Sequence, residues 1–323
     1  MDSPFTLMGR AALGPGNDRR QGMSPFVWVV AVIGLGCIPI LTSQSAPPTS
    51  VRFEGGVLPA RWTDQNPDCE HAQAFRMHTY NPTFFILRQS GCTHFEKPFL
   101  YLLFGSREAL LVDTGARGAD ISKTIGELVR RSAHETNPLP LLVLHSHGHG
   151  DHTAGDAALQ GRAATRVISA QPQASMDFFK LKNWPAEIAQ YDLGDRVVDI
   201  LPIPGHEPAS VAIYDRRTGI LLTGDTLYPG RLYVRDSRAF VASIDRLVDF
   251  TRTREVTHLL GAHIENTRTP YLDYPQGTTF QPEEHVLELG RAHLLELQDA
   301  LRQMGDYLER RLLRDFTVWP VVP

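Results

Sequence analysis

The sequence predicts a mixed α/β (α+β) fold for the main part of this chain. Short apolar or aromatic segments, typical of β-strands, recur between residues 75 and 260. Segments with helical spacing of apolar residues interrupt them at about 120–131 and 238–252. Several of the predicted strands end in loops that contain glycine together with histidine or aspartate.

The predicted strands are short, apolar or aromatic, and bounded by turn residues. They cover residues 75–80, 83–88, 99–104, 108–113, 141–144, 197–203, 211–214, 220–222 and 256–260, with 316–319 as an edge strand. Residues 156–192 are expected to form helix and loop. A long amphipathic C-terminal helix is expected to begin at Pro282, because Glu283 and Glu284 favour a first helical turn.

Composition and charge narrow the classes of function. The chain is 42% hydrophobic and 21% charged, as in an ordinary globular protein with a sizeable core. The formal net charge of −4 provides no basic surface for nucleic acid. We therefore expect a small-molecule substrate and no nucleic-acid partner.

The first 45 residues have the layout of a secretory signal peptide or N-terminal anchor. Arg19 and Arg20 precede an almost entirely apolar run at 26–41, and small polar residues follow it. The run is short for a membrane span and is interrupted by glycine and proline. We expect export to the periplasm or the extracellular space, and the alternative is an uncleaved membrane anchor at 26–41.

Two further regions follow this segment. Residues 46–68 contain proline and serine and are expected to form a linker, and residues 69–323 are expected to form one domain with the C-terminal helix.

Apart from Cys37, only Cys69 and Cys92 are cysteines. An exported protein can join them in a disulfide, worth about 3 kcal/mol in the chain-entropy model. Two buried free thiols are the alternative.

The densest group of ligand-type residues follows the predicted strand at 141–144. The sequence there reads His145-Ser146-His147-Gly148-His149-Gly150-Asp151-His152. The two glycines allow the backbone to turn tightly. Imidazole and carboxylate groups bind zinc and other first-row divalent metals. The pattern predicts a metal site, and a polar histidine-rich loop is the alternative.

Other ligand-type residues stand at the ends of further predicted strands. They are Asp113, His206, Asp225 and His263. Strand ends at one edge of a sheet can converge although they are far apart in the sequence, so we expect these residues to join the metal site. Taken singly, His206 could cap a turn, Asp225 could begin one, and His263 could be a core histidine.

Taken together, these motifs resemble the metallo-β-lactamase superfamily. The resemblance covers roughly residues 75–263 and includes Asp113-Thr114-Gly115, Pro204-Gly205-His206 and Gly224-Asp225-Thr226. It implies an αβ/βα sandwich, in which two mixed sheets face each other with helices outside. It also implies that the domain at 69–323 is a metal-dependent hydrolase.

The resemblance further implies a two-metal site with seven ligands. These are His147, His149 and His206 for the first metal, Asp151, His152 and His263 for the second, and Asp225 as the bridge. Asp113 would orient a ligand histidine without binding metal itself. His145 lies outside the motif and is expected to be structural.

Zinc is the expected metal in both positions, with iron or manganese as alternatives. Three neutral imidazoles on one ion leave a position open for water. Two ions about 3.5–4 Å apart can share a hydroxide and lower its pKa to near neutrality. This bridging hydroxide would attack a carbonyl carbon or a phosphorus, and Asp151 would act in catalysis by holding the nucleophile's hydrogen.

The expected function is hydrolysis of an ester, thioester, lactone or related acyl compound. With aspartate at position 225, the chain resembles glyoxalase II, lactonases and thioesterase-like members of the superfamily. It differs from β-lactamases with a cysteine ligand, which have cysteine at that position. The segment after His263 lacks the basic glutathione-binding pattern expected of glyoxalase II. The alternatives are an iron-dependent, dioxygenase-like redox enzyme, a phosphodiesterase, a β-lactamase, or a non-catalytic metal-binding module.

Substrate contacts are expected on the loop that follows Asp225. Tyr228, Arg231 and Tyr233 lie there, and a tyrosine hydroxyl or a guanidinium can polarise a carbonyl or pair with a carboxylate. Loop packing is the structural alternative. Residues 265–281 are expected to form a lid or pocket wall, or otherwise a surface connection to the last helix.

Overall fold

The computed structural model describes residues 52–63, 69–132 and 139–321. The chain divides into two units, Met1–Ser50 and Val51–Pro323. The expected signal peptide or anchor at 1–45 lies outside the described residues. Within the described ranges, no helix combines the length and the apolar character needed to cross a membrane.

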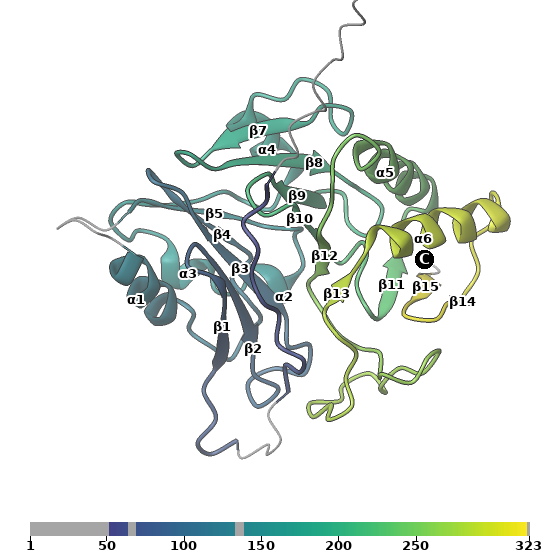
Figure 1. Ribbon diagram of the computed structural model, residues 1–323, viewed down its shortest axis with the longest axis horizontal. Coiled ribbons are helices and arrows are strands. Elements are labelled where there is room, and N and C mark those ends of the chain that lie inside the picture. Colours follow the sequence, from purple (N-terminus) through teal and green to yellow (C-terminus); the bar gives the residue numbers. More distant parts are fainter. Residues whose placement is uncertain (1–51, 64–68, 133–138, 322–323) are drawn as a thin grey trace, which may run out of the picture. The chain divides into compact units, whose positions relative to one another are not determined.

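Two six-stranded mixed sheets form the framework of the second unit (Figure 1). The first has the order β1-β2-β3-β4-β5-β6, with β1 (Phe75–Asn81), β2 (Phe84–Gln89), β3 (Phe99–Phe104), β4 (Ala109–Val112), β5 (Leu141–Leu144) and β6 (Thr165–Val167). The second has the order β13-β12-β10-β9-β8-β7, with β7 (Ala189–Asp192), β8 (Val197–Pro202), β9 (Val211–Asp215), β10 (Ile220–Gly224), β12 (His258–Gly261) and β13 (Glu288–Leu289).

A third, smaller sheet and six helices complete the described part of the chain. The sheet has the order β11-β15-β14, with β11 (Arg231–Val234), β14 (Arg311–Leu312) and β15 (Thr317–Pro320). The helices are α1 (Ser122–Ser132), α2 (Gly150–Thr153), α3 (Asp156–Leu159), α4 (Pro172–Phe179), α5 (Ser237–Phe250) and α6 (Arg291–Met304). Figure 1 shows α1 and α3 on the side of the first sheet, and α5 and α6 on the side of the second.

Strand alternation builds the apolar layers of the core. In β3, Phe99, Tyr101 and Leu103 belong to the cluster between the two large sheets, whereas Leu100 and Leu102 pack towards α1. The outer face of the second sheet packs on α5 and α6. Full burial of a large apolar side chain contributes roughly 1.5–3 kcal/mol. These layers confirm the predicted αβ/βα sandwich of two mixed sheets with outer helices.

Most predicted elements are present, with ends that differ by at most two residues from the predicted ones. Residues 156–192 also contain the strands β6 and β7, which the sequence pattern does not predict. Both strands are short and largely half-exposed, so neither has a clear apolar period. The sequence analysis predicts an edge strand at 316–319, but the corresponding strand β15 is the central strand of the third sheet.

The C-terminal helix begins at Arg291, so the prediction of a start at Pro282 is wrong. Residues 282–290 instead reach into the domain. Nη1 of Arg88 lies 2.5 Å from Oε2 of Glu284, and both side chains are almost fully buried. Within this segment, Glu288–Leu289 form β13, which pairs with β12. Tertiary contacts therefore override the local helix-start signal.

Residues 52–63, which fall within the expected linker, pack along the domain. The backbone nitrogen of Val57 donates to the carbonyl oxygen of Tyr80 at 3.1 Å. Trp62 is 2% exposed and meets the ring of Phe99 edge-on at 4.9 Å.

Cys69 and Cys92 form the predicted disulfide, with their Cα atoms 5.2 Å apart. The disulfide ties the start of the domain to the loop between β2 and β3.

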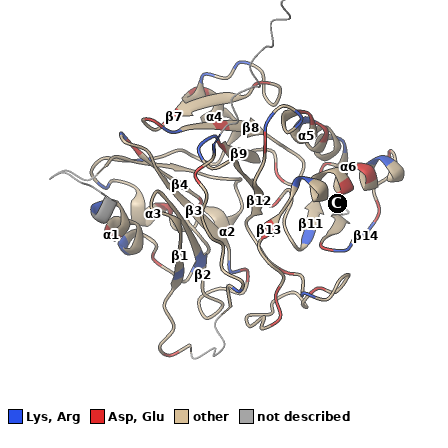
Figure 2. Ribbon diagram, in the orientation of Figure 1, with Lys and Arg blue, Asp and Glu red and all other residues tan. Residues whose placement is uncertain are grey.

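Acidic and basic residues are interspersed along the described elements (Figure 2). In the core, Arg196 pairs with Asp215 of the second sheet and also donates hydrogen bonds to the first sheet. Arg196 is fully buried, with Nε 3.0 Å from Oδ1 and Nη2 2.6 Å from Oδ2 of Asp215. Its Nη1 donates to the carbonyl oxygens of Thr83 and Phe104, next to β2 and at the end of β3. Such a pair is tolerated in the interior because its donors and acceptors are satisfied.

We expect Arg196→Met to lower the free energy of unfolding by about 3–5 kcal/mol, because Asp215 is left charged and unpaired in the interior. Urea unfolding measures this change. Adding Asp215→Leu to the variant should recover part of the loss. Arg252→Met is the control: it removes an ion pair with Asp249 whose side chains are 69% and 71% exposed. The control should cost less than about 1 kcal/mol, and equal losses would contradict the role of Arg196.

Candidate metal centre

The ligand-type residues meet at one edge of the two large sheets. Strands β4 and β5 run parallel, as do β10 and β12, so their carboxyl ends point the same way within each sheet. The segments after β4, β5, β8, β10 and β12 carry Asp113, residues 145–152, His206, Asp225 and His263 respectively. The strand ends thus bring together residues that are far apart in the sequence.

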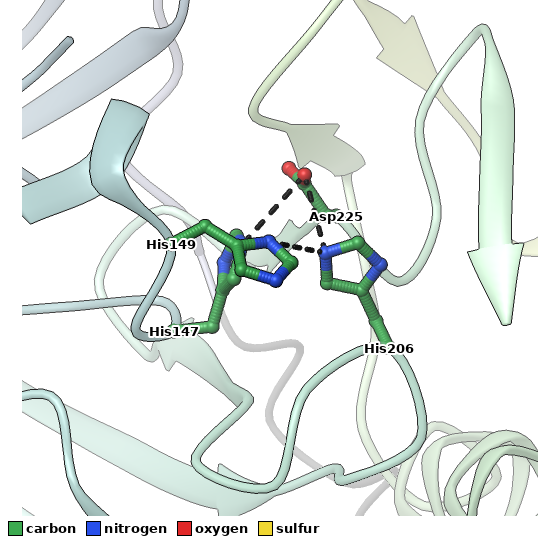
Figure 3. A group of neighbouring side chains, drawn as sticks. All are labelled: His147, His149, His206 and Asp225. Carbon is green, nitrogen blue, oxygen red and sulfur yellow. Dashed lines mark hydrogen bonds and ion pairs between the residues drawn. The ribbon is translucent and has the colours of Figure 1, made fainter. Parts of the chain in front are cut away.

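Four residues form the first ligand group, shown in Figure 3: His147, His149, His206 and Asp225. Nδ1 of His149 lies 2.9 Å from Nε2 of His147 and 3.0 Å from Nε2 of His206. Oδ2 of Asp225 lies 3.7 Å and 3.5 Å from the same two Nε2 atoms. Three imidazoles and a carboxylate that converge in this way are a donor set suited to one zinc ion.

The second group contains Asp151, His152 and His263, again with Asp225. Oδ2 of Asp151 lies 3.0 Å from Nε2 of His152 and 3.2 Å from Nε2 of His263. Oδ1 of Asp225 lies 3.6 Å and 3.3 Å from these nitrogens. Each carboxylate oxygen of Asp225 therefore faces a different group. The structure brings together all seven residues that the sequence analysis names as ligands.

Asp225 is buried, and its Oδ1 has no hydrogen-bond partner among the described residues. A buried polar atom without a partner is costly, so this position favours a cation. Burial by itself would raise the pKa of Asp225, but the charges of His263, His152 and His147 hold that pKa well below its ordinary value. The carboxylate is therefore an anion with a free acceptor atom.

Backbone carbonyl groups orient two of the histidines. Nδ1 of His206 lies 2.8 Å from the carbonyl oxygen of Tyr233, and Nδ1 of His263 lies 2.9 Å from that of Glu96. A carbonyl oxygen only accepts, so both Nδ1 atoms carry the hydrogen. Whenever the ring is neutral, its lone pair is therefore on Nε2, which faces the centre as a metal ligand requires.

Asp113 holds one histidine of each group in place. Its Oδ2 lies 2.9 Å from Nδ1 of His152, which is the contact that the sequence analysis expects. Ser146 adds a second connection: its Oγ donates to Oδ2 of Asp113 at 2.8 Å and lies 3.1 Å from Nδ1 of His147. Because the hydroxyl hydrogen points to Asp113, its oxygen accepts from His147. The sequence pattern does not predict this relay.

His145 lies outside both groups. Its Nε2 is 2.8 Å from Oδ1 of Asp156, and its Nδ1 is 3.0 Å from the carbonyl oxygen of Ile168. These contacts fasten the start of the histidine motif to α3 and to the segment after β6. They agree with the structural role expected for His145.

Two glycines allow the ligand loops to approach their neighbours. Gly224 precedes Asp225 and has φ +52°, and a Cβ there would lie 2.8 Å from Cβ of Ser146. Gly205 precedes His206 and has φ +142°, and a Cβ there would lie 2.4 Å from the Cα of Phe240. Side chains are excluded at both positions by space and by backbone conformation.

The two groups differ in the protonation of their histidines. Burial lowers the pKa of His147, His149 and His206, so the first group presents neutral imidazoles. Burial also acts to lower the pKa of His152 and His263, but the surrounding carboxylates, Asp151 and Asp225 among them, raise both pKa values well above the ordinary value. A cation that binds the second group must therefore displace protons.

A cavity of about 520 Å³ opens over both groups. Its volume is within the range of small-molecule sites. The walls come from three parts of the chain: residues 95–97, residues 275–278 with Gln281, and the strands β11 and β15. Part of the segment 265–281 thus forms the pocket wall that the sequence analysis expects.

Tyr228, Arg231 and Tyr233 all line this cavity, although Arg231 and Tyr233 lie in β11 and not in a loop as predicted. Arg231 pairs with Glu265 at 2.8 Å and with Asp273 at 2.6 Å. Its guanidinium is therefore engaged in holding the cavity wall. The hydroxyl of the buried Tyr228 donates to the carbonyl oxygen of Arg231.

Several further residues line the cavity that the sequence analysis does not name as site residues, among them Lys97, Arg235 and Trp319. Lys97 is buried, and its Nζ donates to the carbonyl oxygens of Phe95 and Thr278 at 2.5 Å each. It thereby joins two walls of the cavity. A lone lysine in a loop carries no sequence signal of such a role, whereas Trp319 could be found from strand alternation with the apolar Val318.

Burial, with a smaller contribution from the charge of Arg88, lowers the pKa of Lys97 from 10.5 to about 8. Between these pH values the unfolded chain binds more protons than the folded one, so the free energy of unfolding should rise with pH. We expect the stability of the wild type relative to Lys97→Met to increase between pH 8 and 10.5, measured by urea unfolding. Lys123→Met, at an exposed position, should give a flat difference. A flat difference for Lys97 would contradict the prediction.

Comparison with known proteins finds similar sequences and similar solved structures. The chain is 33% identical over 135 residues to a hydroxyacylglutathione hydrolase of Anaeromyxobacter dehalogenans, covering 40% of this chain and 46% of that protein. It is 27% identical over 202 residues to the human acyl-coenzyme A thioesterase MBLAC2, covering 51% and 72%. The structure of a metallo-beta-lactamase from Pontibacter korlensis aligns with a TM-score of 0.48 and 17% identity, covering 71% and 99%.

A family model matches the central part of the chain. Residues 98–279, more than half of the chain, match the model described as the metallo-beta-lactamase superfamily. The matched range contains the seven ligand-type residues, together with Asp113. The chain therefore belongs to the metallo-β-lactamase superfamily.

Proposed function

We propose that this protein is a dinuclear zinc hydrolase of small acyl substrates. One observation carries the proposal: Asp225 turns one oxygen towards each ligand group, and its Oδ1 lacks a hydrogen-bond partner among the described residues. A buried carboxylate between two sets of three further ligands is the arrangement needed to hold two ions side by side. Such pairs of ions serve hydrolytic reactions.

The donor set fits two zinc ions. The first would be held by His147, His149 and His206, the second by Asp151, His152 and His263, and both by Asp225. Imidazole and carboxylate suit zinc, and iron or manganese would accept the same donors. When bound, such ions lower the pKa of a shared water towards neutrality and polarise the oxygen of the substrate's reacting group.

In this proposal, Asp151 accepts a hydrogen bond from the attacking water. Asp151 lines the cavity beside His152 and His263, whose charges outweigh the effect of burial and lower its pKa. It therefore remains an acceptor that can hold the hydrogen of the attacking water. No serine or cysteine lines the cavity in the described part of the chain, so water is the nucleophile in this proposal.

Esters, thioesters and lactones are the proposed substrates. The names of two relatives, a hydroxyacylglutathione hydrolase and an acyl-coenzyme A thioesterase, support acyl substrates. The disulfide between Cys69 and Cys92 supports export to the periplasm or the extracellular space. Metal analysis of the purified protein, followed by parallel assays of esters, thioesters, lactones, nitrocefin and phosphodiesters, tests the proposal. Turnover of phosphodiesters alone would refute the acyl class.

We expect His149→Ala and Asp225→Asn to lose bound metal and to lower turnover by at least about 100-fold, more than the loss of a residue that only supports a ligand. Metal content per chain and kcat/KM are the measurements. His145→Gln is the matched control from the same motif and should keep its metal. Full turnover by metal-free His149→Ala protein would refute the hydrolase mechanism.

Asp113→Ala should weaken metal binding by about 10–100-fold in both positions, because it releases His152 directly and His147 through Ser146. Competition with a chelator, followed by metal analysis, resolves the release of each ion. Loss of one ion with unchanged affinity for the other would show that the hydrogen bonds from Asp113 through Ser146 to His147 do not contribute to metal binding.

A further inference from the structure

The third sheet presents one face to the core and the other to the cavity. Strands β11 and β15 pair in parallel, with Leu232 opposite Val318 and Tyr233 opposite Trp319. Leu232 and Val318 are fully buried in the cluster with α5 and α6. Successive side chains of a strand point to opposite faces, so Tyr233 and Trp319 share the other face, and both line the cavity.

These two aromatic residues line the same cavity as the ligand groups, and the backbone of Tyr233 contacts the first group. Their ring centroids are 6.0 Å apart with an interplanar angle of 54°. The carbonyl oxygen of Tyr233 accepts the hydrogen bond from Nδ1 of His206 at 2.8 Å. A compound whose reacting carbonyl lies at the ligand groups can therefore extend its neighbouring atoms towards these two rings within the same cavity.

Both rings are held in place before any ligand arrives. The guanidinium of Arg310 lies over the ring of Trp319, 3.9 Å from the centroid, as in a cation–π contact. Nε of Arg231 donates to the hydroxyl of Tyr233 at 3.1 Å. Trp319 is only half-buried, so part of its indole surface remains open to a ligand. A preorganised aromatic surface loses little entropy when a ligand binds.

We propose that the C-terminal strand β15 sets the substrate preference of this enzyme, with Trp319 and Tyr233 as a subsite for a flat aromatic ring on the acyl compound. This inference rests on the proposed hydrolysis of acyl substrates and narrows their class to aryl-bearing esters and thioesters. Flat rings gain stacking or edge-to-face contacts that puckered rings of equal size do not make.

Matched ring pairs test the subsite. Purified, metal-loaded protein is titrated with N-benzylacetamide and N-(cyclohexylmethyl)acetamide, which resist hydrolysis, and binding is followed calorimetrically. We expect the flat ring to bind several-fold to about tenfold more tightly. Trp319→Ala should abolish this preference, and Trp319→Phe should restore most of it. Tyr307→Ala, at a position 89% exposed, is the control and should bind as the wild type does.

Turnover of the matching thioesters locates the ring. S-benzyl thioacetate carries the aromatic ring on the leaving group, and the S-methyl thioester of phenylacetic acid carries it on the acyl group. Each compound is compared with the one in which a cyclohexyl ring replaces the phenyl ring. The side that shows a flat-ring preference in kcat/KM, lost in Trp319→Ala, is the side that the subsite binds.

The outcomes separate the two proposals. A flat-ring preference in amide binding that Trp319→Ala removes, without turnover of any thioester, supports the subsite and refutes the hydrolase. Turnover with equal affinity for both rings, or with a preference that survives in folded Trp319→Ala, overturns the subsite and leaves the hydrolase intact. Absence of measurable binding of either amide also overturns the subsite.

Discussion

The buried carboxylate of Asp225 is the constraint on which the rest of the site depends. It lies where the second sheet ends, and its two oxygens face two different sets of histidines. An anion in this position, with one oxygen lacking a hydrogen bond among the described residues, is stable only beside positive charge. Imidazolium groups supply part of that charge, and bound cations would supply it more completely.

The packing of the two large sheets sets the position of this carboxylate relative to the other ligand-type residues. His147, His149, Asp151 and His152 come from the end of the first sheet, whereas Asp225 and His263 come from the second. Their distances therefore depend on how the sheets pack. The apolar cluster between the sheets and the buried pair of Arg196 with Asp215 fix that packing. Asp113 then orients one histidine in each group through a single carboxylate.

In the proposed enzyme, the chemistry and the selectivity would come from different parts of the chain. The ligand residues all lie between positions 147 and 263, at strand ends. The cavity wall draws on the loop before β3, on residues 275–281 and on the final strand β15. Arg231 belongs to the wall, where its ion pairs with Glu265 and Asp273 hold neighbouring segments together. Such a division allows the wall to change while the reacting centre stays the same.

The sequence by itself determined most of the strands and the candidate ligand residues, because these depend on local signals: short apolar runs, glycine turns and closely spaced histidines. The order of the layers followed from the resemblance to the metallo-β-lactamase superfamily and not from these local signals. Tertiary structure alone decided where the last helix begins, since Glu284 meets Arg88 across 196 positions of sequence. It also placed Arg231 and Tyr233 in a strand that pairs with β15, and Lys97 between two cavity walls. Contacts of such long range leave no periodic pattern within either segment, so only the folded chain reveals them.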